Sequence, residues 1–345
     1  MISFGSASKA DRLKSNKGIS FIGTQRNGPF TVERGEAERL LAMPTNPNGR
    51  SNSDVVRKWS NGIDLTRRSS DTWIIDFGDI ALEKAMLYEA PFAQVEREVK
   101  PTRENLRRQG HREKWWIYGE NRPGLRAAVK GIDRMLVTAM VAKYRNFVWL
   151  PEIQIPENLC VAIARNDDTT FGILHSRFHE LWSLRMGTFL GVGNDPRYTP
   201  STTFETFPFP EGLTPNIPAA DYAADPRAVA IAAAAARLNE LRENWLNPAD
   251  LVNRVPEVVP GYPDRLLPKD DVAAAELKKR TLTNLYNARP AWLQHAHKAL
   301  DEAVAEAYGW GDDWRGGKLT EDEILSRLFR LNQTRAAAEA AQKSK

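Results

Sequence analysis

Short runs of apolar residues, separated by turn-forming residues, mark the first 150 positions of the chain. These runs are rich in β-branched and aromatic residues and are bounded by Gly, Asn, Asp or Pro, a pattern that predicts strands. Between the second and third runs, the pattern of residues 81–110 predicts helices that Pro91 and Pro101 interrupt. The predicted strands are Gly18–Gly23 (GISFIG), Thr72–Gly78 (TWIIDFG), Arg134–Met140 (RMLVTAM) and Asn146–Leu150 (NFVWL).

Residues 151–210 add one strand and one amphipathic helix to this pattern. The strand is Leu159–Ala164 (LCVAIA), and a polar Asn-Asp-Asp turn follows it. From Gly172 to Met186 the spacing predicts one continuous helix with a single apolar face. That face is expected to pack into the core, and it is formed by Leu174, Phe178, Leu181 and Trp182.

Beyond Pro210 the pattern becomes helical, with two Pro-rich crossings at residues 207–220 and 256–268. An Ala/Leu-rich helix is predicted between the crossings, over residues 228–246. Two further helices are predicted at residues 276–287 and 290–310. Thr320 and Glu323 have the spacing of a capping box ahead of a last helix, and the Ala-rich tail after it is expected to fray.

The order of these elements predicts an α+β fold, with a mixed, β-rich section followed by a mainly helical C-terminal region. At 345 residues, with 42% hydrophobic positions, 10 Trp and 13 Phe, the chain can bury a sizeable core. No apolar run approaches the roughly 20 residues that a membrane span requires, and the first residues do not resemble a secretory signal. The only cysteine, Cys160, excludes an internal disulfide, so we expect a cytoplasmic protein.

The net charge of +4 is concentrated in one segment. Between Gln94 and Arg145 there are 13 Lys and Arg against six Asp and Glu, a local charge of +7. Such a block is typical of a surface that binds a polyanion, because cations there neutralise phosphates. The alternative is a solvated helix face, with the neighbouring tryptophans in the core and the arginines paired with Glu. We expect Trp115 and Trp116 to be mostly core and a subset of the arginines to contact nucleic acid.

Two histidines have the helical spacing of zinc ligands, and we do not assign them to a metal. His175 and His179 are four residues apart, but Ser176 occupies the position where the metalloprotease motif requires Glu. No third ligand is evident nearby, so structural or DNA-facing histidines fit better. Gly191-Val192-Gly193 also lacks the preceding strand and the third glycine of a dinucleotide-binding loop.

A second catalytic pattern is the Asp…Glu-x-Lys arrangement of metal-dependent nucleases. Asp76 or Asp79 would supply the first carboxylate, and Glu98 and Lys100 the other two groups. Glu98 and Lys100 fall in a predicted helix, where a spacing of two directs side chains apart. A solvated helix face is the favoured interpretation, and no catalytic residue is assigned.

Several blocks of the chain resemble, in the same order, the large bacterial N6-adenine DNA methyltransferases of the type IIL, or MmeI-like, restriction–modification group. The similarity covers nearly the whole chain. The blocks are GPFTVERGEAERLL, NPNGRSNSDVVRKWSNGIDLTRR, DTWIIDFGD, MLYEAPF, VAKYRNFVWLP, LHSRFHELW, RYTPSTTFETFPFP, LNPADLVNRVPEVVPGYPDRLLP and LTNLYNARPAWL.

The resemblance implies that this chain recognises the DNA target and does not itself catalyse methyl transfer. In that family a preceding S-adenosylmethionine-binding domain holds the cofactor and flips the adenine, and this chain contains neither of its motifs. Asn194-Asp195-Pro196-Arg197-Tyr198 has Arg where the adenine-binding motif has a second Pro. The chain alone is therefore expected to be inactive, to hold no cofactor or metal, and to serve a methyltransferase core supplied in cis or in trans.

The same resemblance assigns roles to four ranges. Residues 1–18 would be a remnant or linker of the missing core, 19–210 the target-recognition domain, 211–268 a Pro-rich connector with one helix, and 269–345 the helical C-terminal region. The partner would be double-stranded DNA, with no membrane involved. The residues expected to contact DNA are Arg67, Arg68, Arg103, Arg107, Arg108, Arg112, Lys114, Lys143, Arg145, His175, Arg177, His179 and Arg185.

Two other functions remain open at this point. An autonomous DNA-binding protein would need no methyltransferase core and would show no exposed apolar patch near Ile2 and Phe4, where a core would dock. A metal-dependent nuclease would require Asp76, Glu98 and Lys100 to converge on a divalent ion.

Overall fold

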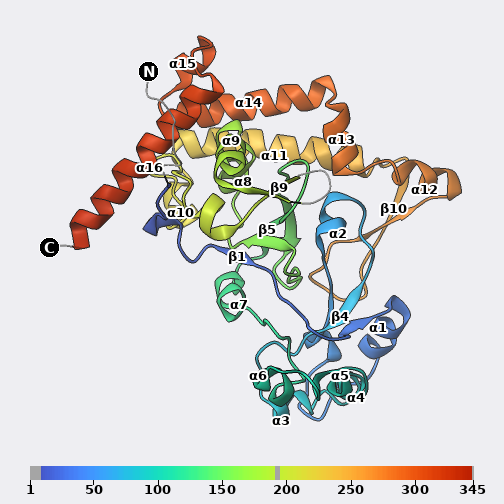
Figure 1. The fold of residues 1–345 in the computed structure, drawn as a ribbon. Coiled ribbons are helices and arrows are strands. Elements are labelled where there is room, and N and C mark those ends of the chain that lie inside the picture. Colours follow the sequence, from blue (N-terminus) through green and yellow to red (C-terminus); the bar gives the residue numbers. More distant parts are fainter. Residues whose placement is uncertain (1–8, 191–194, 344–345) are drawn as a thin grey trace.

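The computed structural model describes residues 9–190 and 195–343, which form an α+β fold with two lobes (Figure 1). The larger lobe, above in Figure 1, holds a four-stranded sheet and the long C-terminal helices. The smaller lobe below it holds a three-stranded sheet and several short helices. The predicted fold class is confirmed.

The central sheet of the larger lobe is antiparallel throughout, with the strand order β1-β7-β5-β6. Successive side chains of a strand point to opposite faces, so the sheet separates two sets of apolar residues. Leu136, Val161 and Ile163 belong to the large core on one face, whereas Val137 and Ala162 belong to a smaller cluster on the other. The strands, all predicted from the sequence, are β1 (Ser20–Ile22), β5 (Arg134–Ala139), β6 (Val148–Pro151) and β7 (Cys160–Ile163).

Helices cover both faces of this sheet. The large core joins one face to the C-terminal helices, and the smaller cluster joins the other face to residues of α2 and α7. The core therefore runs through both residues 19–210 and residues 269–345. The helices concerned are α2 (Gly62–Thr66), α7 (Pro123–Val129), α8 (Asp168–His175), α9 (Arg177–Met186), α11 (Pro226–Leu246), α13 (Leu282–Ala288), α14 (Ala291–Ala307) and α16 (Glu321–Lys343).

The smaller lobe has its own core around the sheet β2-β4-β3. Trp73 and Ile75 of the middle strand are almost fully buried, and Trp115 and Trp116 are 9% exposed, so the expectation that the last two are core residues is confirmed. The elements are β2 (Thr31–Val32), β3 (Val56–Lys58), β4 (Trp73–Ile75), α1 (Arg34–Leu41), α3 (Leu82–Ala85), α4 (Glu89–Glu98), α5 (Lys100–Arg103) and α6 (Gln109–Glu113), with a 3₁₀ turn at Asn52–Asp54.

The continuous helix predicted from Gly172 to Met186 is wrong, because Ser176 divides it into α8 and α9. Ser176 has an extended backbone, and its hydroxyl accepts the N–H of His179 at 3.4 Å while donating to the Ile173 carbonyl at 2.6 Å. Serine is a favoured helix N-cap because its side chain satisfies a free backbone N–H. The four apolar residues of the predicted face are nevertheless all buried.

The region around the second Pro-rich crossing is a β-hairpin, which the sequence pattern did not predict. Strand β10 (Val252–Val255) pairs antiparallel with β11 (Arg265–Pro268). Glu257, in the loop between them, forms ion pairs with Arg34 and Lys58 at 2.7 Å each. The hairpin that emerges from the larger lobe is thereby attached to the smaller one. A short helix, α10 (Ala219–Tyr222), also lies in residues 211–268 beside the predicted α11.

The C-terminal segment differs from the prediction at two places. Residues 276–287 do not form one helix, since α12 (Asp271–Leu277) ends before Thr281 caps α13. The described part of the tail is helical instead of frayed, because α16 continues to Lys343 and the Glu339 carboxylate accepts the backbone N–H of Lys14 at 3.0 Å, while residues 344 and 345 lie outside the described residues. The remaining elements are the 3₁₀ turn Lys14–Asn16, the π-helix Pro200–Phe204, α15 (Gly311–Arg315), and the hairpin strands β8 (Thr188–Leu190) and β9 (Asp195–Arg197).

Of the helices described, none combines the length and the apolar character that a membrane crossing requires. Ile2 and Phe4, where a docking patch was considered, lie outside the described residues, as do Gly191, Val192 and Gly193.

Candidate nucleic-acid interface

The buried member of the basic block is Arg103, at the end of α5. Its side chain is 1% exposed and its guanidinium donates to the carbonyl oxygens of Asn27 and Arg26 at 2.7 Å each. It also donates to the carbonyls of His111 at 3.3 Å and Ile117 at 3.2 Å. Burial lowers the pKa of Arg103, which forms no ion pair with a carboxylate of the described residues. Its predicted contact with DNA does not fit this placement, and Arg103 instead fixes the loop before β2 against the α5–α6 segment.

The cations that follow Arg103 in the α5–α6 segment, Arg107, Arg108, Arg112 and Lys114, are exposed. Arg108 is paired with Glu120 at 3.2 Å, and Arg112 donates to the carbonyl oxygens of Leu106 and Arg107. Arg107 and Lys114 make no side-chain hydrogen bond or ion pair with the residues that the structure describes. An exposed cation without a protein partner can neutralise a phosphate without first breaking an internal bond.

The loop that Arg103 holds carries another cation, Arg26, which was not predicted from the sequence. Its guanidinium lies 4.6 Å from the centre of the Trp59 ring. Gln25 in the same loop forms a bridge with Glu120, and Asn27 adopts a left-handed backbone with φ of 54°. Arg122 adopts φ of 52° where α7 begins and donates to the carbonyl of Gly23 at 3.1 Å. Because Gln25 forms a β-bridge with Glu120, the neighbouring Arg26 lies close to Glu120, which is also the ion-pair partner of Arg108.

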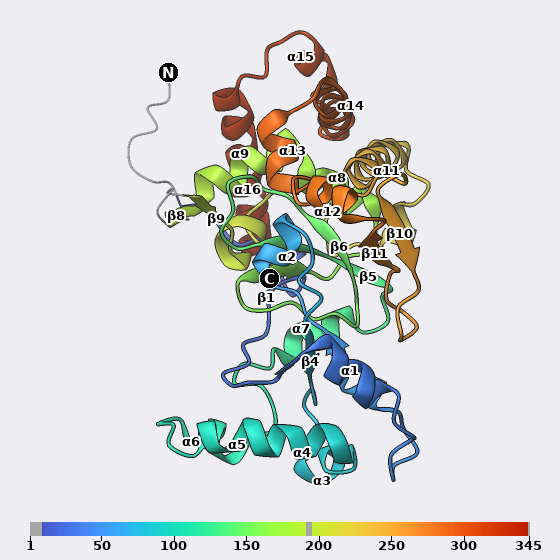
Figure 2. The same cartoon turned by 90° about the vertical axis from the view of Figure 1, so that its right-hand side faces the viewer.

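The hairpin β8–β9 projects from the larger lobe on the side on which α6 projects from the smaller lobe, at the left of Figure 2. Its Phe189 and Leu190 are 45% and 44% exposed, and Arg185 is exposed at the end of the preceding α9. Gly187 is needed at the base, because a Cβ there would lie 2.6 Å from the carbonyl oxygen of Arg197. The two projections give this side of the molecule both cationic and apolar contact groups.

Arg145 and Lys143 lie in the loop that contacts the base of this hairpin. Arg145 donates to the carbonyl oxygens of Ala139 and Pro196, and burial lowers its pKa to about 10. Arg145 therefore ties β9 to the end of β5, and its guanidinium is already engaged. Lys143 is exposed, and its ammonium donates to the side-chain oxygen of Asn287 at 2.8 Å.

The two histidines are buried and serve the core. The ring Nε2 of His179 lies 2.8 Å from the hydroxyl of Tyr198, and burial lowers the pKa of His179 to about 3. His175 accepts the backbone N–H of Phe147 at 2.9 Å, and burial holds its pKa well below the usual range. Both imidazoles therefore bond to groups of the core. The structural alternative considered for them is therefore the one that the geometry supports.

Arg67 and Arg68 directly follow α2 and line a cavity together with residues of β11. Arg68 donates to the carbonyl of Leu246 at 2.9 Å and to the side-chain oxygen of Asn247 at 2.7 Å, and burial lowers its pKa. Its guanidinium therefore fixes α2 to the end of α11. Arg67 is exposed, lines a cavity of about 390 Å³, and has no side-chain partner in the described part of the chain.

The groups of the possible nuclease site do not converge. The buried Asp76 is held by the two guanidinium nitrogens of Arg126 at 2.9 and 3.0 Å. Although burial opposes it, Arg126 lowers the pKa of Asp76. Glu98 pairs with Arg97, and Lys100 pairs with Glu96. Across residues 9–190 and 195–343, no three His, Cys, Asp or Glu side chains gather as a metal site would require.

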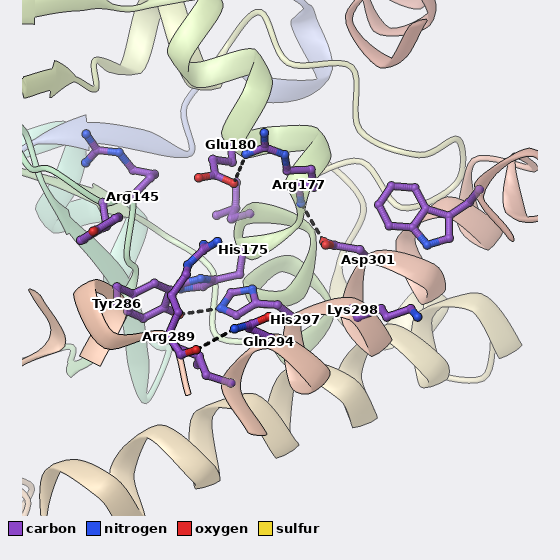
Figure 3. A pocket seen from close by; sticks show the side chains of 14 residues that line it. Arg145, His175, Arg177, Glu180, Tyr286, Arg289, Gln294, His297, Lys298 and Asp301 are labelled. Carbon is purple, nitrogen blue, oxygen red and sulfur yellow. Dashed lines mark hydrogen bonds and ion pairs between the residues drawn. The ribbon is translucent and has the colours of Figure 1, made fainter. Parts of the chain in front are cut away.

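A cavity of about 330 Å³ lies among α8, α9, α13, α14 and the loop that carries Arg145 (Figure 3). Arg177 lines it and is paired with Glu180 at 2.8 Å and with Glu321. The backbone N–H of Arg177 donates to the carboxylate of Asp301 at 2.8 Å. Arg177 is therefore neutralised by acids, and it faces the cavity instead of the side with the two projections.

The fold of this chain is similar to part of a solved structure. No family model matches the chain, and no curated protein matches it. Among solved structures, the chain is similar to the type IIL restriction–modification enzyme MmeI in complex with DNA, with a TM-score of 0.65 and 17% sequence identity. The similarity covers 96% of this chain and 38% of the MmeI chain. The fold is thus that of a section of a type IIL restriction–modification enzyme.

Proposed function

We propose that this chain is the sequence-specific DNA-recognition module of an N6-adenine DNA methyltransferase of the restriction–modification type. The observation that carries the proposal is the similarity of nearly the whole chain to little more than a third of an enzyme solved with DNA. A shared fold does not imply a shared function, so the role is argued from the surface as well.

The proposed DNA-binding surface is the side with the two projections. The α5–α6 segment would contribute Arg107, Arg108, Arg112 and Lys114 as phosphate contacts. The β8–β9 hairpin would contribute Phe189 and Leu190 from the opposite end, with Arg185 and Lys143 behind it. Phosphate contacts fix orientation, and side chains that reach base edges provide specificity.

The same reasoning leaves seven of the initially selected residues out of this DNA-binding surface. Arg103 and Arg145 are already bonded to backbone carbonyls, and His175 and His179 are buried. They would act by positioning the loops that carry the exposed cations. Arg67, Arg68 and Arg177 lie elsewhere, at cavities that are separate from the two projections.

The chemistry would come from a methyltransferase core that binds S-adenosylmethionine and receives the adenine, either in the same polypeptide or in a separate one. The whole complex would act on double-stranded DNA in the cytoplasm. This chain would recognise the DNA sequence and would contribute no reacting group.

A methyl-transfer assay tests this function. Labelled S-adenosylmethionine and mixed-sequence duplex DNA are incubated with the chain alone, with a candidate methyltransferase core alone, and with both. The proposal predicts site-specific transfer only in the mixture. Transfer by the chain alone would refute the assignment, and an inactive mixture with intact DNA binding would indicate an autonomous DNA-binding protein.

A further inference from the structure

The cavity of Figure 3 is lined by more cationic than acidic side chains. Arg289, where α13 ends, and Lys298 of α14 both line it, and neither makes a side-chain hydrogen bond or ion pair within the described chain. Arg145 lines the same cavity and is bonded to carbonyl and hydroxyl oxygens only. Of the two acids of the cavity, Glu180 pairs with the Arg177 guanidinium, whereas Asp301 accepts the Arg177 backbone N–H and burial raises its pKa to about 7.

A fully buried arginine lies behind this cavity. Arg242 of α11 is 2% exposed, and its guanidinium contacts the carbonyl of Phe147 at 3.0 Å and Nε2 of His175 at 3.1 Å. Its Nε has no hydrogen-bond partner in the described chain, and no carboxylate pairs with it. Burying a cation without a counter-ion is costly, so a negative group that occupies the cavity would offset part of that cost.

The contacts of His175 determine which of its ring nitrogens carries the proton. Nε2 lies 3.2 Å from the Phe147 carbonyl oxygen, but two donors, the Phe147 N–H and Arg242, point at it, and we therefore assign the proton of the neutral ring to Nδ1. His175 lines the cavity, and its Nδ1 has no partner among the described residues. The ring therefore has a free N–H donor.

A second histidine of the cavity, His297, is also neutral and lies near the same cations. His297 lines the cavity and lies 2.7 Å from the hydroxyl of Tyr286. Burial lowers the pKa of His297 to about 3, and the charges of Arg242 and Arg289 add to the shift. For His175, burial and then Arg242 are the main causes of its lowered pKa. Both rings thus experience cations and supply neutral hydrogen-bonding groups.

We propose that this cavity is an anion site for a phosphate group, held by Arg289, Lys298 and the N–H of His175, with Arg242 behind them. The volume of about 330 Å³ is at the lower end of small-ligand sites and holds one phosphate with part of the molecule that carries it. Guanidinium groups are suited to phosphate because they donate two parallel hydrogen bonds to its oxygens. The site does not depend on the DNA-recognition role.

Two sources can supply the phosphate: a free phosphate or nucleotide, and a backbone phosphate of bound DNA. Inorganic phosphate, AMP and a mixed-sequence duplex are titrated separately into the full chain by calorimetry. The variants are Arg289→Gln with Lys298→Gln, both of exposed residues. The control is Arg254→Gln, an exposed cation of β10 outside the cavity and outside the proposed DNA surface.

The site predicts saturable binding of at least one of the three probes, weakened at least tenfold in the double variant and unchanged in Arg254→Gln. Weakened phosphate or AMP binding with unchanged duplex affinity identifies a free phosphate. Weakened duplex affinity without phosphate or AMP binding identifies the DNA backbone. In either case the His297 pKa, followed by NMR, should rise on binding. Equal affinities of the native chain and the double variant for all three probes would overturn the proposal.

Discussion

The guanidinium of Arg103 donates to the carbonyl oxygen of Arg26 at 2.7 Å, so the buried arginine of the basic block positions the loop that carries Arg26. A backbone carbonyl has no charge to neutralise, and the bond therefore fixes the geometry of the loop without using the Arg26 side chain, which packs over Trp59. Within the basic block, the buried Arg103 and the exposed Arg107 and Arg108 therefore serve different purposes. This separation underlies the predictions for the smaller lobe.

Removing two exposed cations of the α5–α6 segment should weaken DNA binding and reduce its dependence on salt. Every phosphate that the protein no longer neutralises lowers the slope of log K against log salt by about 0.9, so Arg107→Ala with Arg108→Ala should lower it by up to about 2. Fluorescence anisotropy with a labelled duplex at several salt concentrations measures this. Arg254→Ala with Lys269→Ala, on the β10–β11 hairpin, is the control pair, and an equal loss of affinity in both pairs would remove the segment from the interface.

An apolar contact by the β8–β9 hairpin should affect affinity without affecting the salt slope, because no counter-ion is released. Phe189→Ala is expected to weaken duplex binding by about tenfold, or about 1.4 kcal/mol, which lies within what the burial of one aromatic side chain contributes. The same titrations test it. Val258→Ala removes another exposed apolar side chain, in the loop between β10 and β11 and outside the proposed DNA-binding surface, and should have no effect. Equal affinity of Phe189→Ala and the native chain would show that the hairpin does not touch DNA.

Replacing Arg103 by Met should destabilise the smaller lobe. Because Arg103 is buried, the substitution should leave the exposed surface unchanged. The four backbone carbonyls that Arg103 satisfies would lose their donor, at a cost of roughly 1–3 kcal/mol in the free energy of unfolding. Denaturant unfolding measures that decrease in stability. Arg107→Ala, a change to an exposed neighbour, should leave the stability unchanged. An Arg103→Met variant as stable as the native chain would contradict the positioning role.

The ion pairs of Glu257 should make stability fall in acid. Although burial alone would raise it, hydrogen bonds from Arg34 and Lys58 lower the pKa of Glu257 to about 2. The carboxylate is charged in both states above its unfolded pKa of about 4.3, where its full contribution is present. That contribution is lost as the pH falls from about 4.3 through 2.

Unfolding of the native chain and Glu257→Gln between pH 7 and pH 2 tests this effect. The difference in stability, about 2 kcal/mol near neutral pH on the scale of charged hydrogen bonds, should shrink as the pH falls. Glu302→Gln, which removes a partner of the exposed Arg315, is the matched control. A difference that stays constant with pH would mean that Glu257 is not charged in the folded protein.

The strands of the central sheet could be predicted because each is a short, mainly apolar run between turn residues. Leu136 and Val137 belong to opposite cores, and such a two-sided strand has consecutive apolar residues. The β10–β11 hairpin could not be found in this way. Its residues are mostly exposed, and it is held by Glu257 to residues more than 180 positions away, which leaves no local pattern.

The sequence indicated where along the chain the cationic residues of the candidate site are concentrated. It did not indicate which of them are exposed. The sequence shows that arginines are concentrated before residue 145, but burial separates Arg103 and Arg145 from Arg107 and Arg108. Arg26 was missed because it stands alone in the sequence. The break at Ser176 had a local signal, a helix N-cap residue inside an apolar pattern, and recognising it would have placed the two histidines on separate helices.

The decisive experiment is the selection of duplexes from a random-sequence library by the full chain, followed by sequencing. The proposed function predicts that the chain binds duplex DNA and enriches one short motif, and that Arg107→Ala with Arg108→Ala reduces recovery without changing the motif. Absence of duplex binding, or binding that enriches no sequence, would contradict the assignment of this chain as a DNA-recognition module.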